Sequence, residues 1–162
     1  METQISKITT VINYNRVVEI IQEAGIVLLD RFNKRNSRHL EGIDTGYVKE
    51  KAEKELVIRE DLISQDIVIN GIKEFEPDTV IYSEELNNVH LIEKDRNEIK
   101  FILDPLDGTH NFYYGMPYWG IGLAVLNKHN ESIAGFIYLP VLDIFIKNEG
   151  NNSPTLIKFT CP

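Results

Sequence analysis

Asp104 and Asp107 stand three residues apart in the segment ILDPLDGTHNF, at the end of an apolar run. Two carboxylates this close repel each other unless a cation or a proton separates them. Mg²⁺ prefers oxygen ligands and needs few protein groups, which leaves positions for water and a substrate phosphate. Gly108 permits a close backbone approach, and a helix beginning at Thr109 would direct free N–H groups at the same place. These residues together predict a site for magnesium and phosphate.

The backbone around the two aspartates is expected to turn. The run IKFIL is predicted to be a strand that ends at Asp104, which would place this carboxylate at the edge of a sheet. Pro105 then fixes the turn, and Asp107 returns a second carboxylate to the same neighbourhood.

Other kinds of site share parts of this pattern. An EF-hand loop would need a Glu at its twelfth position, but the twelfth residue counted from Asp104 is Gly115. A phosphatase with an aspartyl nucleophile of the D-x-D-x-T type has one residue between its carboxylates, whereas two intervene here. An Asp-Gly turn beside an incidental aspartate remains an alternative for the motif alone.

Three further acidic residues are candidates for the same site. Glu84 and Glu85 follow the short β-branched run TVIYS, much as Asp104 follows IKFIL, so both acidic groups could meet at one sheet edge. Adjacent acids are also common on solvated surfaces, which is the alternative for this pair. Asp61 lies at the expected start of a helix, where an N-cap or first-turn acid is the ordinary interpretation.

The elements that must position these residues are two helices and a sheet. Apolar residues recur at helical spacing from Asn15 to about Lys34, and again from about Glu60 to Phe75. The segment from Asn36 to Lys54 has no periodicity and is expected to be a long loop. Strands are expected in five runs, which are TVIYS, IKFIL, WGIGLAVL, IAGFIYL and LDIFI.

Two helices followed by a mostly antiparallel sheet predict a layered α+β fold. We expect one domain over residues 1–150 and an irregular tail over residues 151–162. The hairpin formed by WGIGLAVL and IAGFIYL is apolar on both of its faces, as in a sheet covered from two sides. Because two helices can cover only one face, the other is expected to be exposed and to promote dimerisation or association with a further segment.

Composition narrows the class of protein. The chain has 162 residues, 43% of them hydrophobic, and a net charge of -8 from 25 acidic and 17 basic residues. No basic cluster dominates, which argues against nucleic-acid binding. Cys161 is the only cysteine, so internal disulfides and Cys-based metal clusters are excluded. A polar N-terminus and the lack of any window of ~18 apolar residues predict a cytoplasmic protein without membrane contact.

The motifs SEE, ILDPLDGTHNF and GMPYWGIGLAVL resemble the inositol monophosphatase family. This is the Mg²⁺-dependent, lithium-sensitive phosphatase superfamily that also contains bisphosphate nucleotidases and fructose-1,6-bisphosphatases. The resemblance extends from the first helix to about Lys147. It implies a sugar-phosphatase-type fold and hydrolysis of a small phosphate monoester, such as inositol monophosphate, by water activated on Mg²⁺. Fructose-1,6-bisphosphate and 3'-phosphoadenosine 5'-phosphate are alternative substrates.

The resemblance also implies roles for individual residues. Thr109 would orient and deprotonate the attacking water together with Asp61. The N–H groups of Gly108 and Thr109 would bind the phosphate, and the loop around Lys49 and Lys51 would approach the metals. The implied metal ligands are Glu84, which also counts as catalytic, Asp104, Asp107 and the main-chain carbonyl of Leu106. Glu85, His110 and Asn111 would be neighbours of these groups.

The resemblance covers only the N-terminal half of the family's pattern. The family's second half is α/β and carries a W-D-x-A element whose aspartate completes the metal site, whereas the only tryptophan here is Trp119. We therefore expect weak metal binding and poor activity from this chain alone. A truncated or non-catalytic cation-binding module of the same fold is the alternative function.

Overall fold

The computed structural model describes residues 12–40, 48–50, 56–86, 88, 99–150 and 152–158. Six strands form one sheet in the order β3-β4-β5-β6-β7-β8, and β1 and β2 form a separate antiparallel pair. Within the six-stranded sheet, β3 and β4 run parallel and all other neighbours run antiparallel. The expected layered α+β fold is confirmed. The elements are α1 (Tyr14–Leu40), β1 (Val48–Glu50), β2 (Leu56–Ile58), α2 (Arg59–Phe75), β3 (Val80–Ser83), the 3₁₀ helix η1 (Glu84–Leu86), β4 (Ile99–Asp107), α3 (Thr109–Tyr113), β5 (Gly120–Asn127), β6 (Ser132–Leu139), the 3₁₀ helix η3 (Pro140–Leu142), β7 (Ile144–Glu149) and β8 (Thr155–Lys158).

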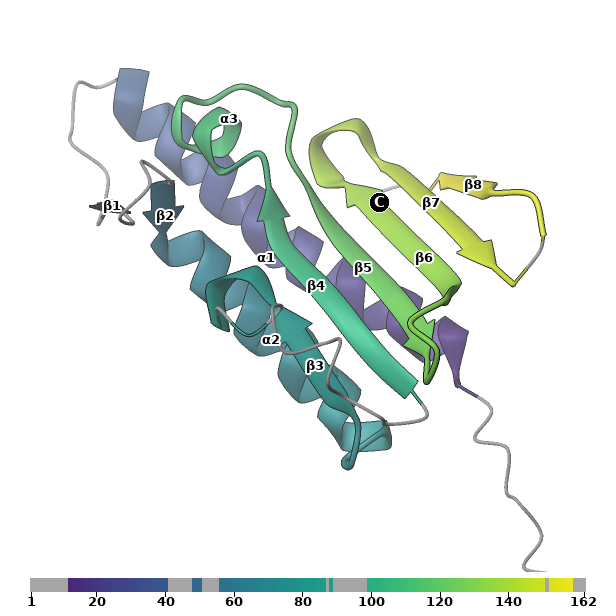
Figure 1. Cartoon of the computed structure of the whole chain (residues 1–162). Coiled ribbons are helices and arrows are strands. Elements are labelled where there is room, and N and C mark those ends of the chain that lie inside the picture. The colour runs from purple at the N-terminus through teal and green to yellow at the C-terminus, as the bar shows by residue number, and fades with distance from the viewer. Residues whose placement is uncertain are drawn as a thin grey trace, which may run out of the picture.

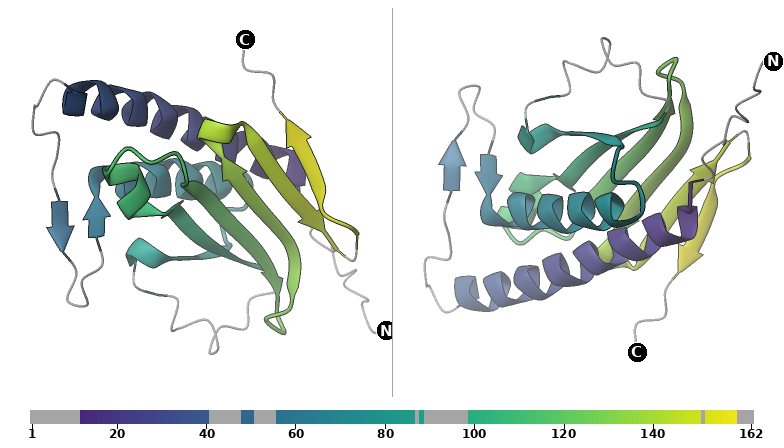
Figure 2. Two further views of the ribbon diagram at one scale, coloured as in Figure 1. Left: turned by 90° about the horizontal axis from the view of Figure 1, so that it is seen from above. Right: turned by 90° about the horizontal axis from the view of Figure 1, so that it is seen from below.

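Both long helices lie on the same face of the sheet (Figures 1 and 2). α1 contacts β5 and β6, and α2 contacts β4. The two helices approach each other closely, since a Cβ added to Gly71 of α2 would lie 2.8 Å from the Ile20 side chain of α1. The core between helices and sheet includes buried side chains from each layer, among them Ile21, Leu28, Val68, Ile72, Phe101, Val125 and Phe136.

The prediction of a long loop from Asn36 to Lys54 is wrong at two places. α1 continues to Leu40, and Val48–Glu50 forms β1. The last turns of α1 are polar and so lack helical periodicity, but Arg35 is buried there against residues distant in sequence. β1 depends on pairing with β2, a partner that its own residues do not specify. Residues 41–47 and 51–55 lie outside the described part of the chain.

The expectation of an irregular tail from residue 151 is wrong for four residues. Thr155–Lys158 forms β8, which pairs antiparallel with β7. A strand this short carries little periodicity of its own, and the unpaired N–H and C=O groups along the edge of β7 provide its hydrogen-bonding partners.

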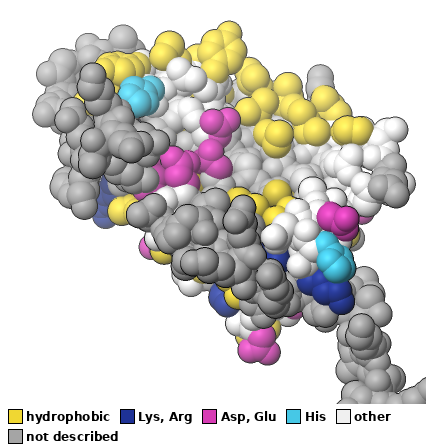
Figure 3. Space-filling model, in the orientation of Figure 1, with side chains coloured by type: hydrophobic (Ala, Val, Ile, Leu, Met, Phe, Trp, Pro, Cys, Tyr) yellow, Lys and Arg dark blue, Asp and Glu magenta, His cyan; other side chains and the backbone are white. Residues whose placement is uncertain are grey.

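The face of the sheet opposite the helices is apolar. Figure 3 shows hydrophobic side chains gathered over the part of the sheet that contains β6 and β7. A shallow cavity of about 430 Å³ lies on this face, and its lining includes Ile102, Ala124, Gly135, Ile137 and Ile146. The side chain of Ile137 is 49% exposed. The described residues therefore leave this apolar face of the sheet exposed, as the sequence predicts.

We expect the purified chain to self-associate through this face, because soluble monomers rarely expose contiguous apolar patches of more than a few hundred Å². Ile137→Lys should shift the chain toward monomer in light scattering after size-exclusion chromatography. Leu62→Lys is the matched control, since Leu62 is an exposed apolar residue of α2, away from the sheet. A wild-type chain that stays monomeric at all concentrations would contradict the expectation.

Candidate metal and phosphate site

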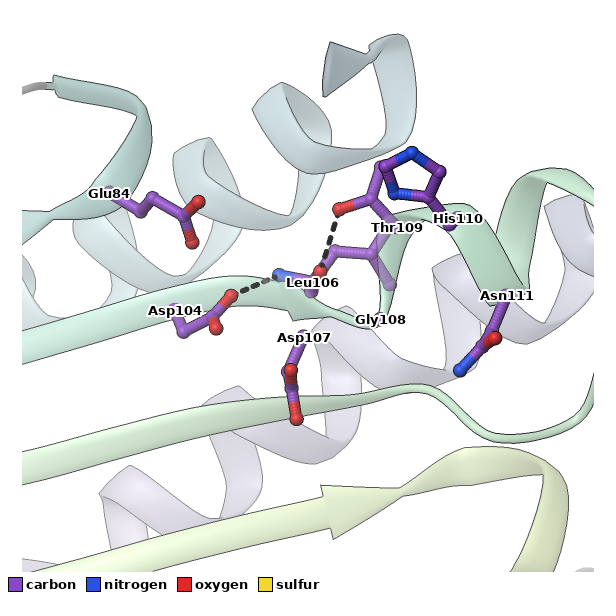
Figure 4. A pocket seen from close by; sticks show the side chains of 8 residues that line it. All are labelled: Glu84, Asp104, Leu106, Asp107, Gly108, Thr109, His110 and Asn111. Atoms are coloured by element: carbon purple, nitrogen blue, oxygen red, sulfur yellow. Dashed lines mark hydrogen bonds between the residues drawn. The ribbon is translucent and has the colours of Figure 1, made fainter. Parts of the chain in front are cut away.

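A β-bulge in β4 brings the two aspartates of the DPLD segment to one side of the sheet. Asp104 pairs with Gly122 and Asp107 with Gly120, so β4 advances three residues while β5 advances two. In a regular strand, side chains three residues apart point to opposite faces. The extra residue of the bulge changes this phase, and both carboxylates line the same cavity (Figure 4).

The predicted strand end at Asp104 and turn at Pro105 are therefore wrong, because β4 continues to Asp107. Pro105 has no N–H to donate to a neighbouring strand, and a bulge is one of the few strand positions that tolerates this. The spacing D-P-L-D is thus explained by a bulge rather than by a turn.

Glu84 reaches the site from the neighbouring strand. β3 and β4 run parallel, and Ser83 at the end of β3 pairs with Leu103. The residues that follow this pair are Glu84 and Asp104, so the chain places both carboxylates at the same edge of the sheet. Of the acidic pair Glu84 and Glu85, which was expected to meet the two aspartates at one edge, Glu84 lines the same cavity as Asp104 and Asp107, whereas Glu85 is not among the lining residues.

Gly108 connects the strand to α3. Its φ of 86° lies in the left-handed region, and an added Cβ would lie 2.8 Å from the main-chain oxygen of Tyr118. Both features require glycine at this position. The chain then enters α3 at Thr109, as the sequence predicts. With five residues α3 is too short for a large dipole, so any anion binding here depends on individual N–H groups.

Asp61 joins the site through Thr109. The Thr109 hydroxyl lies 3.0 Å from Asp61 Oδ1 and 3.1 Å from the main-chain oxygen of Leu106. Asp61 Oδ2 accepts a 2.6 Å hydrogen bond from the N–H of Ile58, the residue before α2. Asp61 is therefore both the first-turn acid that local sequence indicates and the partner of Thr109 that the family resemblance implies.

Two carboxyl groups of the site, those of Asp61 and Asp104, have pKa values above the usual range for aspartate. Burial raises the pKa of Asp61 to about 7, although hydrogen bonds from Ile58 and Thr109 oppose the shift. The pKa of Asp104 rises to about 6, first through burial and then through the charges of Glu84 and Asp107. A neighbouring cation would reverse this like-charge effect.

The donors around the cavity suit a hard cation. The cavity has a volume of about 330 Å³ and is lined by Glu84, Asp104, Leu106, Asp107, Gly108, Thr109, His110 and Asn111. Within the described ranges, no group of three or more His, Cys, Asp or Glu residues is arranged so that it could hold a metal ion. Three carboxylates nevertheless line one cavity, and carboxylate oxygens are the donors that hard cations prefer.

The other residues that the sequence analysis singled out lie at the edge of the site or outside the described residues. His110 and Asn111 line the cavity, and the Asn111 amide donates a 2.6 Å hydrogen bond to the main-chain oxygen of Tyr118. Glu85 contributes through its charge, which raises the pKa of Asp61 and Asp104. Lys49 belongs to β1 but its side chain is not described, and Lys51 lies outside the described residues.

Sequence reasoning did not identify Arg35 and Glu60, which lie behind the site. Glu60, in the first turn of α2, is buried beside Asp61 and forms ion pairs with Arg31 and Arg35. Charged residues in a polar helical segment ordinarily face solvent, and their local sequence gives no signal of burial.

The raised pKa of Asp61 predicts how stability depends on pH. Between pH 4 and 7 the native state binds more protons than the unfolded state, in which the pKa is near 3.8. The free energy of unfolding should therefore fall as pH rises through this range, by at most about 1.4 kcal/mol per pH unit for each such group. The free energy of unfolding can be measured by denaturant titration at several pH values in the presence of a chelator. Its decrease with pH should be smaller for Asp61→Asn than for the wild type.

In the Asp61→Asn variant the free energy of unfolding should still fall somewhat as pH rises, because the pKa of Asp104 is also raised. Asp66→Asn, at an exposed position of α2, should retain the slope of the wild type. Parallel stability curves for wild type and Asp61→Asn would show that Asp61 has no such proton affinity.

The sequence model of the inositol monophosphatase family matches residues 9–154. This chain belongs to that family. One family relative, the fructose-1,6-bisphosphatase/inositol-1-monophosphatase of Aquifex aeolicus, is 30% identical over 135 residues, which cover 81% of this chain and 46% of that protein. The Nus factor SuhB of Haemophilus influenzae is 29% identical over 127 residues, which cover 78% and 43%.

Solved structures share the fold of this inositol monophosphatase family member. The extragenic suppressor protein suhB from Bartonella henselae superimposes with a TM-score of 0.72 at 23% identity, covering 88% of this chain and 51% of that one. A Thermotoga maritima IMPase gives a TM-score of 0.71 at 23% identity, with coverage of 88% and 50%. The chain spans less than half the length of the two curated relatives. Among the described residues, no helix has the length and apolar character needed to cross a membrane.

Proposed function

We propose that this chain carries the metal and phosphate half of a Mg²⁺-dependent phosphomonoesterase, which hydrolyses a small phosphate ester by direct attack of water. The observation that supports this most strongly is the bulge in β4. It places Asp104 and Asp107 on one cavity together with the hydroxyl of Thr109. Neither a simple turn nor a surface acidic patch needs that arrangement.

The donors proposed for Mg²⁺ are the carboxylates of Glu84, Asp104 and Asp107 and the main-chain oxygen of Leu106. These are hard oxygen atoms that line one cavity. The Leu106 oxygen already lies near the Thr109 hydroxyl, and its second lone pair is available to a cation. When bound, Mg²⁺ would lower the pKa of a water and offset charge on the phosphate and the leaving oxygen.

Thr109 and Asp61 would handle the proton of the attacking water. With its hydrogen directed at Asp61 Oδ1, the Thr109 oxygen has lone pairs that can accept a hydrogen bond from water. Asp61, with a pKa of about 7, has a proton affinity suited to a general base near neutral pH. The pair would therefore orient the water and receive its proton.

The phosphate would be bound by the N–H groups of Gly108 and Thr109, two residues that line the cavity. For the ester itself, inositol monophosphate is the leading candidate, since relatives are named inositol monophosphatase. Fructose-1,6-bisphosphate follows from the name of the Aquifex aeolicus relative. 3'-Phosphoadenosine 5'-phosphate remains a third candidate.

A non-catalytic module that binds cations is the alternative function. Some relatives are named Nus factor SuhB rather than phosphatase. Under this alternative the chain would bind Mg²⁺ without releasing phosphate.

The decisive assay measures phosphate release from inositol 1-phosphate by the purified chain with and without Mg²⁺. We expect slow release that requires Mg²⁺ and no ³²P retained on the protein after acid quenching, because water attacks directly. Label trapped as an acyl phosphate on Asp104 or Asp107 would contradict the mechanism. Mg²⁺ binding with no release of phosphate, even at high protein concentration, would favour the non-catalytic module.

A further inference from the structure

Arg35 is a buried cation near the end of α1. Arg35 is only 5% exposed, although the surrounding segment NKRNSRHL is polar. A buried guanidinium is costly unless its charge is paired. The groups that Arg35 contacts must therefore offset the cost of burying its charge.

Arg35 contacts two elements that are far apart in sequence. Its Nη2 atom lies 3.7 Å from Glu60 Oε2 in the first turn of α2. The centre of its guanidinium lies 4.9 Å from the ring centroid of Tyr113, the last residue of α3. Asp61 follows Glu60 directly, and Thr109 begins the helix that Tyr113 ends. Arg35 thus joins the two elements that supply the Asp61–Thr109 hydrogen bond.

We propose that Arg35 is a positioning residue, which holds the first turn of α2 and α3 at the separation that the 3.0 Å bond between Thr109 Oγ1 and Asp61 Oδ1 requires. A planar guanidinium can pair with a carboxylate through its edge and stack on an aromatic ring through its face. An ammonium cannot make both contacts with the same geometry. The catalytic consequence of this inference rests on the proposed function, whereas the positioning itself does not.

The fold around Arg35 has other supports, so its replacement should be tolerated. Phe32, one turn earlier in α1, packs against Phe112 of α3 and against Trp119, with ring centroids 5.3 and 5.4 Å away. These contacts keep α3 docked on α1 without Arg35. Glu60 also keeps a 3.3 Å ion pair with Arg31. The expected change is a local shift in the site rather than unfolding.

Arg16 provides a matched control. It also connects α1 to α2, through a 3.5 Å ion pair with Glu74. Glu74 lies at the other end of α2 from Asp61, so Arg16→Met removes a more exposed cation that pairs the same two helices without touching the site.

The structural test compares crystal structures of the wild-type, Arg35→Met and Arg16→Met chains. We expect the distance from Thr109 Oγ1 to Asp61 Oδ1 to exceed about 3.5 Å, the limit of a hydrogen bond, in Arg35→Met only. An unchanged distance in Arg35→Met would overturn the proposal, whatever the chain's activity. If Arg35→Met fails to fold, Arg35→Lys retains the buried charge and should show the same lengthening. An unchanged distance in Arg35→Lys would then overturn the proposal.

The kinetic test applies once Mg²⁺-dependent turnover has been measured. Arg35→Met should lower kcat by about 10- to 100-fold, because misplacement by about 1 Å is enough for such a loss, and should change KM little. In an Asp61→Asn background the same substitution should have almost no further effect, since the carboxylate that Arg35 is proposed to position as a base is already gone. Equal fold losses in both backgrounds would indicate a general structural role and contradict the proposal. Absence of turnover in the wild type would count against the proposed function, and the structural test would still decide the role of Arg35.

Discussion

We expect Asp107→Asn to abolish Mg²⁺-dependent phosphate release and to leave the fold of the chain intact. Asp107 is exposed at the cavity and ends the bulged part of β4, so an amide of the same shape fits without repacking. An amide carries no charge to offset Mg²⁺, and loss of a metal ligand removes several kcal/mol of charge stabilisation. Phosphate release should therefore fall by about 1,000-fold or more, and calorimetric Mn²⁺ affinity should weaken as well.

Asp66→Asn controls for the change in net charge, because it removes the same charge from an exposed position of α2. This control should retain wild-type turnover and Mn²⁺ affinity. Circular dichroism should give the same spectrum for all three proteins. An Asp107→Asn chain that releases phosphate at the wild-type rate would show that Asp107 is not part of the metal site.

Thr109→Ala should slow phosphate release by about 100-fold, with little change in Mg²⁺ affinity. The hydroxyl is proposed to orient the attacking water and to pass its proton to Asp61, and general-base catalysis contributes about 10²- to 10⁴-fold. Steady-state kinetics over a range of Mg²⁺ concentrations would separate the loss in kcat from any loss in metal binding.

Thr109→Ser is the matched control for this substitution, because it keeps the oxygen that lies 3.0 Å from Asp61. Thr109→Ser should retain most of the activity that Thr109→Ala loses. Equal losses in both variants would point to the methyl group and its packing. Such a result would contradict a role for the hydroxyl in catalysis.

The sequence predicts the layers of the fold well where local pattern determines structure. The helical spacing before Lys34 and after Glu60 reflects burial of one face of each helix, and both helices are found. The local sequence does not predict β8 or the last turns of α1, because both depend on partners that are distant in sequence. β8 needs the edge of β7, and Arg35 needs Glu60.

The candidate site was predicted as a set of residues but not as a geometry. The types and order of the residues in DPLDGT indicate oxygen donors, a glycine conformation and a helix start, and each of these is present in the structure. The bulge was missed because Pro105 fits a turn and a bulge equally well in sequence. The bond between Asp61 and Thr109 joins residues 48 positions apart, a pairing that only the family resemblance indicates.

The central claim is that a divalent cation binds beside Asp104 and Asp107, and titration of Mn²⁺ into the ¹⁵N-labelled chain tests it most directly. Mn²⁺ is paramagnetic and broadens the NMR signals of amides close to it. We predict that the amide signals of Asp107, Gly108 and Thr109 broaden first, at the lowest Mn²⁺ concentrations. Asp107→Asn should remove this early broadening. Broadening that begins instead around the exposed acids Glu19, Glu23 and Glu74, or that spreads evenly over this acidic protein, would contradict the claim.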